Sequence, residues 1–282
     1  MLNQHKKKIP ILMYHSISWS SNSRFKQFTV PPVVFAEQMA YLYNHQYTPI
    51  TVTQFINARS KNGFALPERP VVLTFDDGFA DFFTEVLPVL KRYGFVATLY
   101  VATAFINGTS HWLQHIGEGA RLMLTWDQLI EICASGVECG AHSHSHPQLD
   151  TLPHFIARDE IIRSKRLLVH YLCQEIFSFA YPYGYHTARV RQLVREAGYT
   201  SACAVRHAMS SVTDDPFSLA RIMVRADSNI EEFAALLIGR SSSPAIAVYK
   251  IYARARTPVW QLVRRCAASA TQYLQERRLA WH

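Results

Sequence analysis

The sequence predicts an α/β protein built around parallel strands. Short apolar runs alternate with amphipathic segments six or seven times along the chain, and this alternation is typical of parallel α/β folds. Polar motifs directly follow several apolar runs, at the strand ends where parallel sheets and barrels place their functional sites. A chain of 282 residues with 49% hydrophobic residues can also bury one large core.

Seven apolar runs of strand length predict the sheet. In chain order they cover residues 9–14, 70–75, 95–101, 137–141, 177–181, 199–205 and 219–224. Helical spacing and end signals predict helices over residues 31–42, from 51, and over 80–93, 125–136, 152–172, 186–197 and 230–237, with a long helix in the C-terminal segment. Thr125 and Gln128 have the spacing of a capping box, and Gly94 and Gly136 mark the ends of two helices.

Positive charge is concentrated at the C-terminus. The formal net charge is +8, and residues 240–282 contribute eight Lys and Arg against one Glu, or +7. The rest of the chain is therefore nearly neutral, which argues against a nucleic-acid partner. Residues 240–282 are predicted to form a basic amphipathic helix, because apolar positions between 259 and 274 lie beside the arginines. Such a helix can rest on anionic lipid, and packing on the main domain is the alternative.

The terminal sequence and the cysteines indicate a cytoplasmic protein. No apolar stretch reaches the roughly 18 residues of a spanning helix. The basic run at residues 6–8 precedes an apolar stretch of only residues 9–14, interrupted by Pro10, which is short for a signal peptide. Five cysteines without a C-x-x-C pair suit a reducing compartment. We therefore expect a cytoplasmic protein, peripheral at the inner membrane if the basic helix binds lipid.

Two adjacent carboxylates follow the second predicted strand. Residues 74–78 read T-F-D-D-G, with Asp76 and Asp77 at the strand end. Neighbouring carboxylates repel each other, and they become useful when one binds a cation and the other transfers protons. A solvated turn is the alternative for this motif taken alone.

Three histidines follow the fourth predicted strand. His142 and His146 are four residues apart, and a helical turn would bring both rings to one side while His144 points away. Two imidazoles and a carboxylate make a three-ligand site for a divalent metal, with open positions for water. Three histidines within five residues are seldom core packing, so the motif predicts a metal site.

An aromatic turn follows the fifth predicted strand. Residues 179–184 read F-A-Y-P-Y-G, so an apolar strand runs into a tight turn containing Pro182 and Tyr183. This turn could offer a rigid backbone N–H and an aromatic wall. A turn beside the core explains the motif equally well.

Taken in order, the three motifs resemble those of the polysaccharide deacetylases of carbohydrate esterase family four, which share the NodB homology domain. The matching patterns are T-F-D-D-G, H-S/T-x-x-H-P and P-Y-G, over roughly residues 70–225. The resemblance implies a distorted (β/α) barrel, often with seven parallel strands. Residues 70–239 would form the NodB domain, residues 1–69 would add a first strand and helices, and residues 240–282 would form the basic helix.

The resemblance also implies roles for individual residues. Asp77, His142 and His146 match the ligands of a divalent metal, usually Zn²⁺, and Asp76 matches the catalytic base. The backbone N–H of Tyr183 matches the donor to the oxyanion, and its ring would line the sugar pocket. The turn residue Pro182 and the aromatic residue Trp126 are further candidates for substrate contact, although Trp126 is equally plausible as a core residue, as are Trp112 and Tyr181.

Two family positions differ in this chain. Many relatives carry an arginine that orients the base where Ala180 stands here. Arg221 or Arg225 could reach the site from the last predicted strand, and we favour Arg221, with a surface arginine as the alternative. The family's late histidine, its usual general acid, is also absent. We propose His15 at the end of the first strand instead, as in some exopolysaccharide deacetylases with rearranged motifs, and a structural histidine is the alternative.

The sequence therefore predicts a metal-dependent hydrolase that removes N-acetyl groups from a glycan containing N-acetylhexosamine. The substrate could be an oligosaccharide, a polysaccharide or a lipid-linked glycan. A degenerate deacetylase fold that only binds carbohydrate is the main alternative. A metal-dependent phosphoesterase is another, but it would usually need further ligands or a second metal.

Overall fold

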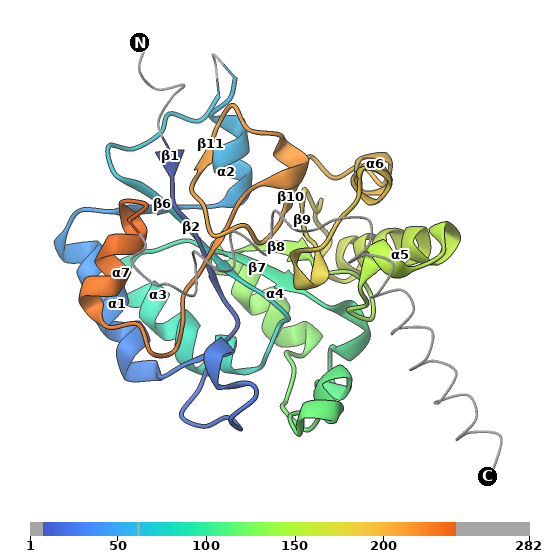
Figure 1. Cartoon of the computed structure of the whole chain (residues 1–282), viewed down its shortest axis with the longest axis horizontal. Helices are drawn as coiled ribbons and strands as arrows, with labels where there is room; N and C mark the ends of the chain where they lie inside the picture. The colour runs from blue at the N-terminus through green and yellow to red at the C-terminus, as the bar shows by residue number, and fades with distance from the viewer. Residues whose placement is uncertain (1–7, 61–62, 241–282) are drawn as a thin grey trace.

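A curled sheet of parallel strands forms the centre of the molecule (Figure 1). The computed structural model describes residues 8–60 and 63–240. Seven strands run in the order β10-β9-β8-β7-β6-β2-β12, and every pairing between them is parallel. Their bounds are β2 Ile11–Tyr14, β6 Pro70–Phe75, β7 Thr98–Val101, β8 Glu138–Ala141, β9 Ser178–Ala180, β10 Ser201–Cys203 and β12 Ile222–Met223.

Short strands complete this arrangement. β5 (Thr48–Ile50) pairs with the first half of β6, whose last residues pair with β7. β1 (Lys8–Ile9) and β11 (Ser210–Ser211) form an antiparallel pair, and β3 (Ser16–Ile17) and β4 (Thr29–Val30) form a parallel one.

Backbone hydrogen bonds bring the two ends of the strand order together. The N–H of Ala204 donates to the carbonyl of Leu219 at 2.8 Å, and the N–H of Leu219 donates to Ala202 at 3.0 Å. These bonds join the β10 edge to the segment that leads into β12. The strands therefore curl into a distorted barrel, which confirms the predicted fold class. All six residues of β6 are buried, as expected for a parallel strand covered on both faces.

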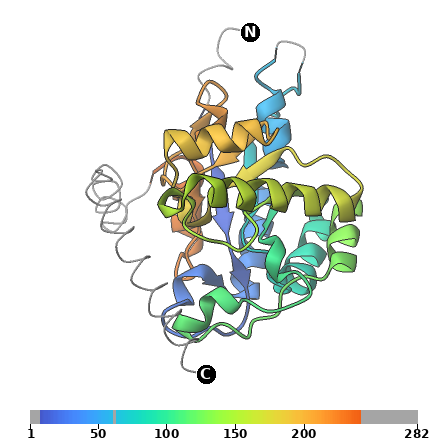
Figure 2. The same ribbon diagram turned by 90° about the vertical axis from the view of Figure 1, so that its right-hand side faces the viewer.

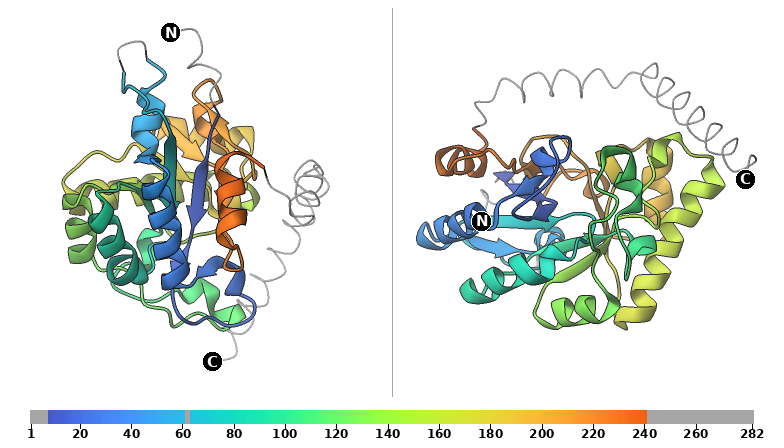
Figure 3. Two further views of the ribbon diagram at one scale, coloured as in Figure 1. Left: turned by 90° about the vertical axis from the view of Figure 1, so that its left-hand side faces the viewer. Right: turned by 90° about the horizontal axis from the view of Figure 1, so that it is seen from below.

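The α-helices of the described residues pack around the strands (Figures 2 and 3). They are α1 Pro32–Asn44, α2 Val52–Asn57, α3 Leu87–Tyr93, α4 Trp126–Ala134, α5 His154–Leu172, α6 Ala188–Glu196 and α7 Ile230–Leu237 in the described part of the chain. Thr51 and Thr125 begin α2 and α4 with complete capping boxes, which satisfy backbone donors that the helix leaves unpaired. Gly94 ends α3 in the left-handed conformation, with φ of 63°.

The structure differs from the sequence prediction in a few elements. The helix expected over residues 80–93 begins as a π-helical turn, Phe82–Val86, and becomes α-helical only at Leu87. Pro88 gives the physical reason, because proline lacks the N–H that an uninterrupted α-helix needs and its ring crowds the carbonyl four residues earlier. The last strand is only two residues long. The predicted C-terminal helix lies outside the described residues.

Among the described residues, none of the helices has the length and apolar character that crossing a membrane requires.

A close approach between two strands gives a test of the packing. A Cβ atom at Gly140 in β8 would lie 2.5 Å from the ring of Tyr100, which is fully buried. We expect Gly140→Ala to lower the free energy of unfolding by about 1–3 kcal/mol, the usual cost of overfilling a core. Chemical denaturation measures this. Gly108→Ala, whose nearest neighbour atom lies at 3.3 Å, should change stability much less, and equal losses in both variants would contradict the packing.

Candidate metal centre and active site

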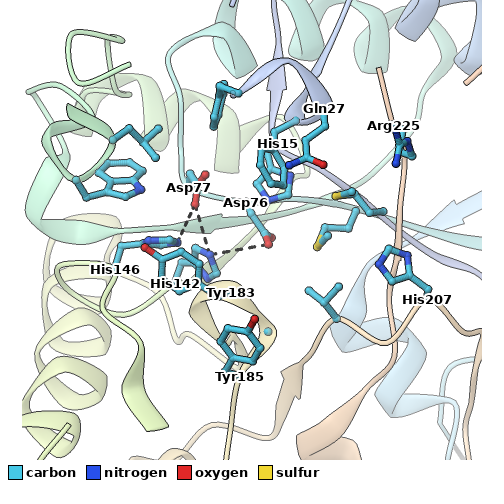
Figure 4. A pocket seen from close by; sticks show the side chains of 18 residues that line it. His15, Gln27, Asp76, Asp77, His142, His146, Tyr183, Tyr185, His207 and Arg225 are labelled. Atoms are coloured by element: carbon cyan, nitrogen blue, oxygen red, sulfur yellow. Dashed lines mark ion pairs between the residues drawn. The ribbon is translucent and has the colours of Figure 1, made fainter. Parts of the chain in front are cut away.

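Asp77, His142 and His146 converge at the carboxyl ends of β6 and β8 (Figure 4). Asp77 Oδ1 lies 3.5 Å from Nε2 of His142 and 3.2 Å from Nε2 of His146. All three side chains are buried. The carboxyl ends of neighbouring parallel strands meet at one edge of the sheet, which is why residues so far apart in sequence come together.

The segment that carries both histidines is a loop, so the expected helical turn is wrong. Ser143 and His146 adopt left-handed φ angles of 62° and 59°, and the two ligand-candidate rings lie 4.8 Å apart. Glu160 of α5 holds the loop by accepting the backbone N–H groups of His144 at 2.9 Å and Ser145 at 2.7 Å. The ring of His144 is engaged elsewhere, because its Nδ1 lies 2.9 Å from Thr103 Oγ1.

The donor set fits a divalent metal ion. Four ligand atoms around Zn²⁺ at about 2.0–2.1 Å are about 3.4 Å apart in a tetrahedral site, close to the separations from Asp77 Oδ1. That oxygen is buried and has no hydrogen-bond partner, so a cation would satisfy it. Nδ1 of His142 faces the carbonyl of Ala180 at 2.8 Å, which turns Nε2 toward Asp77 as in many metal sites.

The protonation states suit the same role. Burial lowers the pKa of His142 to about 4, so the imidazole is neutral near pH 7 and keeps a lone pair for a metal. Burial alone would raise the pKa of Asp77, but His146, His15 and His142 bring it well below its usual range. Asp77 is therefore an ionised carboxylate.

Asp76 is held by a buried arginine. Nη1 of Arg221 donates to Asp76 Oδ1 at 2.6 Å, and Nη2 donates to Oδ2 at 2.7 Å. Arg221 is fully buried, and its Nη1 also lies 3.2 Å from Thr74 Oγ1. Burial favours a raised pKa for Asp76, yet Arg221 and His142 lower the pKa below its usual value. Asp76 therefore stays ionised and fixed in orientation. Arg221 supplies the guanidinium that many relatives carry at the position of Ala180.

His15 and Tyr183 complete the surroundings of the two carboxylates. Both line a pocket of about 380 Å³ that also contains Asp76, Asp77 and both metal-candidate histidines. Burial lowers the pKa of His15, whose ring lies 4.9 Å from that of Phe28. Tyr183 has a left-handed φ of 58°, and its ring centre lies 4.8 Å from that of His146.

Two predicted substrate contacts lie outside this pocket. Trp126 begins α4 and stacks on Tyr171 of α5, with ring centres 4.0 Å apart. Pro182 is buried within the turn and does not line the cavity. The tryptophan that lines it is Trp112, whose ring lies 5.3 Å from that of His146.

The sequence gives little indication of which other residues line the pocket. The further lining residues that the sequence analysis did not single out as site candidates are Met13, Phe25, Gln27, Phe28, Leu113, Gly184, Tyr185, Val205, His207 and Met223. Those from residues 25–28 come from a segment that reads as a polar loop. No periodicity marks them, because their position depends on tertiary contacts alone.

Arg121 ties together the two loops that form one side of the pocket. Its Nη1 donates to Glu118 at 3.0 Å, and its Nη2 donates to Ser16 Oγ at 2.5 Å. The guanidinium also lies 5.1 Å from the centre of the Phe25 ring. Since Ser16 directly follows His15, this network fixes the wall beside that histidine.

The chain is similar to known polysaccharide deacetylases. The model of the polysaccharide deacetylase family matches residues 65–202. The chain is 27% identical to YxkH of Bacillus subtilis over 233 residues, which cover 82% of this chain and 76% of YxkH. It is 24% identical to the poly-beta-1,6-N-acetyl-D-glucosamine N-deacetylase of Escherichia coli, over 79% of this chain but only 38% of that longer protein.

A solved structure shares both the fold and part of the sequence. The Streptococcus pyogenes deacetylase PplD, solved in complex with acetate, superposes with a TM-score of 0.71 at 27% identity, over 82% of this chain and 98% of PplD. By sequence and by fold the chain is similar to the polysaccharide deacetylases, and these likenesses indicate a hydrolase of that kind.

Metal binding can be tested directly. Removing one imidazole in His142→Ala should weaken Zn²⁺ binding by more than about 100-fold, since loss of a mere hydrogen-bond partner of a ligand already costs about 10–100-fold. Competition against a chromophoric chelator measures the affinity. His144→Ala changes the same loop but not the donor set, so it should bind Zn²⁺ like the wild type. Similar affinities in the two variants would contradict the site.

Proposed function

We propose that this enzyme removes N-acetyl groups from a glycan containing N-acetylhexosamine units, with Zn²⁺ as its metal. The observation that carries the proposal is an ionised Asp76, fixed by Arg221, beside the buried Asp77, His142 and His146 in one pocket. A relative named as a poly-beta-1,6-N-acetyl-D-glucosamine N-deacetylase and a solved deacetylase that binds acetate support an acetylated substrate.

The two adjacent carboxylates have different proposed roles: Asp77 would bind the metal and Asp76 would accept a proton. A divalent ion held by Asp77, His142 and His146 would polarise the amide carbonyl and acidify a bound water. Asp76 is the general base, because its ionised carboxylate can accept a proton from the attacking water. Arg221 keeps Asp76 in one orientation through two charge-assisted hydrogen bonds.

The remaining groups would stabilise the intermediate and the leaving group. The backbone N–H of Tyr183 would donate to the oxyanion that forms at the carbonyl, and the ring of Tyr183 would contact the sugar. His15 would protonate the amine as it leaves, because an amide anion is a very poor leaving group. His15 and Asp76 line the same pocket, as an acid and a base acting on one substrate must.

The proposed glycan is an oligosaccharide, a polysaccharide or a lipid-linked glycan. We also propose that residues 240–282 contact anionic lipid, and this part of the proposal is supported only by the sequence of that segment.

Acetate release tests the activity. We expect the wild type to release acetate from N-acetylglucosamine oligomers, to lose this on chelation and to regain it with Zn²⁺. Asp76→Asn should lower turnover by about 10²–10⁴-fold, because it removes the base, while Zn²⁺ still binds. A metal-loaded wild type that binds such oligomers but releases no acetate would instead indicate a carbohydrate-binding protein.

The role of His15 needs a separate variant. His15→Ala should keep Zn²⁺ affinity and lose turnover by about 10²-fold or more, since general acid catalysis contributes about that much. The matched control is His115→Ala, which alters an exposed histidine and should leave turnover unchanged. Near-normal acetate release by His15→Ala would show that another group is the acid.

A further inference from the structure

The pocket extends well beyond the residues that the proposed chemistry uses. Figure 4 shows Asp77, His142 and His146 gathered at one end, with Arg225 and His207 on the opposite side of Asp76. Arg221 is the arginine that pairs with Asp76, so Arg225 has no part in holding the base. It nevertheless lines the cavity together with Gln27, Tyr185 and His207.

The strand register fixes how far Arg225 lies from the reaction. Met223 of β12 pairs with Met13 of β2, and the N–H of Val224 donates to the carbonyl of Met13 at 3.0 Å. Continuing this parallel register by two residues brings Arg225 level with His15, on strands spaced by about 4.8 Å. A group bound by Arg225 would therefore belong to the reacting sugar or to its immediate neighbour.

The guanidinium of Arg225 has donors to spare. Its Nε and Nη2 donate to Asp227 at 3.0 and 3.2 Å, which leaves both N–H groups of Nη1 for another acceptor. The Asp227 side chain is 71% exposed and that of Arg225 is 36% exposed. Such a solvated ion pair contributes little net free energy, so it does not prevent Arg225 from binding a second anion.

The carboxylates that act on Arg225 are Asp227 and, at longer range, the exposed Glu232, and water and salt screen both of them. Asp76 is already neutralised by Arg221 through two hydrogen bonds. His207 lies on the same side of the pocket, and its backbone N–H donates to the carbonyl of Arg221 at 2.9 Å, which holds the main chain at this residue. An imidazole and a guanidinium on one wall suit an acceptor with several oxygens, such as a carboxylate or a phosphate.

We propose that the Arg225–His207 end of the pocket binds an anionic group of the glycan, so that the preferred substrate carries a carboxylate or phosphate on or next to the N-acetylhexosamine. This inference rests on the proposed deacetylase function and narrows its substrate class. It sets this chain apart from an enzyme that acts on a neutral N-acetylglucosamine polymer, because a neutral sugar offers no anion to the N–H groups of Nη1.

Binding measurements test the inference independently of turnover. Three tetrasaccharides of equal length serve as probes: neutral N-acetylglucosamine, N-acetylglucosamine alternating with glucuronic acid, and N-acetylglucosamine carrying one phosphate. Calorimetric titration into the full Zn²⁺-loaded chain, in a His15→Ala background that lowers turnover but leaves the Asp76–Arg221 pair intact, gives Kd values. We expect at least one charged probe to bind about tenfold tighter than the neutral one at low salt, a gap of about 1.4 kcal/mol. The gap should shrink at 0.15 M salt, where the Debye length is about 8 Å.

Variants then assign the preference to Arg225. Arg225→Gln should reduce the affinity for the charged probe to that for the neutral one, and Asp227→Asn should widen the gap by removing a competing carboxylate. Arg158→Gln makes the same charge change at an exposed position of α5. It should leave the difference in affinity between charged and neutral probes unchanged. Tighter binding of only the uronic acid probe or only the phosphate probe identifies the anion.

Two results would overturn the inference. One is equal affinity for neutral and charged probes, and the other is a preference for charge that survives Arg225→Gln in a folded protein. Failure of the deacetylase proposal looks different. In that case acetate release from every probe would be absent in the wild type, whatever the order of the affinities.

Discussion

The ion pair between Asp76 and Arg221 is the interaction on which the site depends. Asp76 is 2% exposed and Arg221 is fully buried, and a buried carboxylate without a cation loses its hydration without compensation. Two short hydrogen bonds and the contact to Thr74 satisfy the guanidinium. Because Asp76 follows β6 and Arg221 precedes β12, with β2 between them, the pair also clamps three neighbouring strands. Asp77 then takes its place directly beside this fixed carboxylate.

The sequence identifies the candidate metal ligands and the candidate base, but it predicts only part of the geometry of the site. The positions of the main strands along the chain could be predicted because buried parallel strands are apolar runs with the motifs at their ends. Their lengths could not, since β12 has only two residues of the six predicted. Arg221 could be proposed because it lies within the last predicted strand, residues 219–224, from which its side chain could reach the site. The conformation of residues 142–146 could not be predicted, because spacing alone cannot distinguish a helical turn from a loop held by Glu160.

The pocket walls show the other limit of prediction. Trp112 and Trp126 are both aromatic residues near predicted loops or helix ends, and only the fold decides that one faces His146 while the other stacks on Tyr171. The same holds for Phe28 and His207, which approach the site from segments without a recognisable pattern. Such residues are placed by tertiary packing, which leaves no periodic trace in the sequence.

Backbone strain collects around the pocket. Eight residues other than glycine have a positive φ in the described part of the chain. Asp77, His146, Tyr183 and His207 line the pocket, and Ser143 lies within the histidine loop, so five of the eight belong to this region. Conformations of this kind cost of order 1–3 kcal/mol each and persist where the surroundings enforce them. The surrounding packing therefore holds these residues in conformations that side chains other than glycine seldom allow.

The position of Arg221, directly before the last strand β12, has a consequence for how the protein is made. Asp76 precedes its partner by 145 residues, and at about 5–20 residues per second a ribosome needs roughly 7 to 30 s to bridge that distance. During this interval the strands that carry the metal-candidate residues have been synthesised, but the Asp76 carboxylate has no cation to accompany it into the interior. Until the final strand emerges, the side chain of Asp76 is stable only in contact with water or in its protonated form.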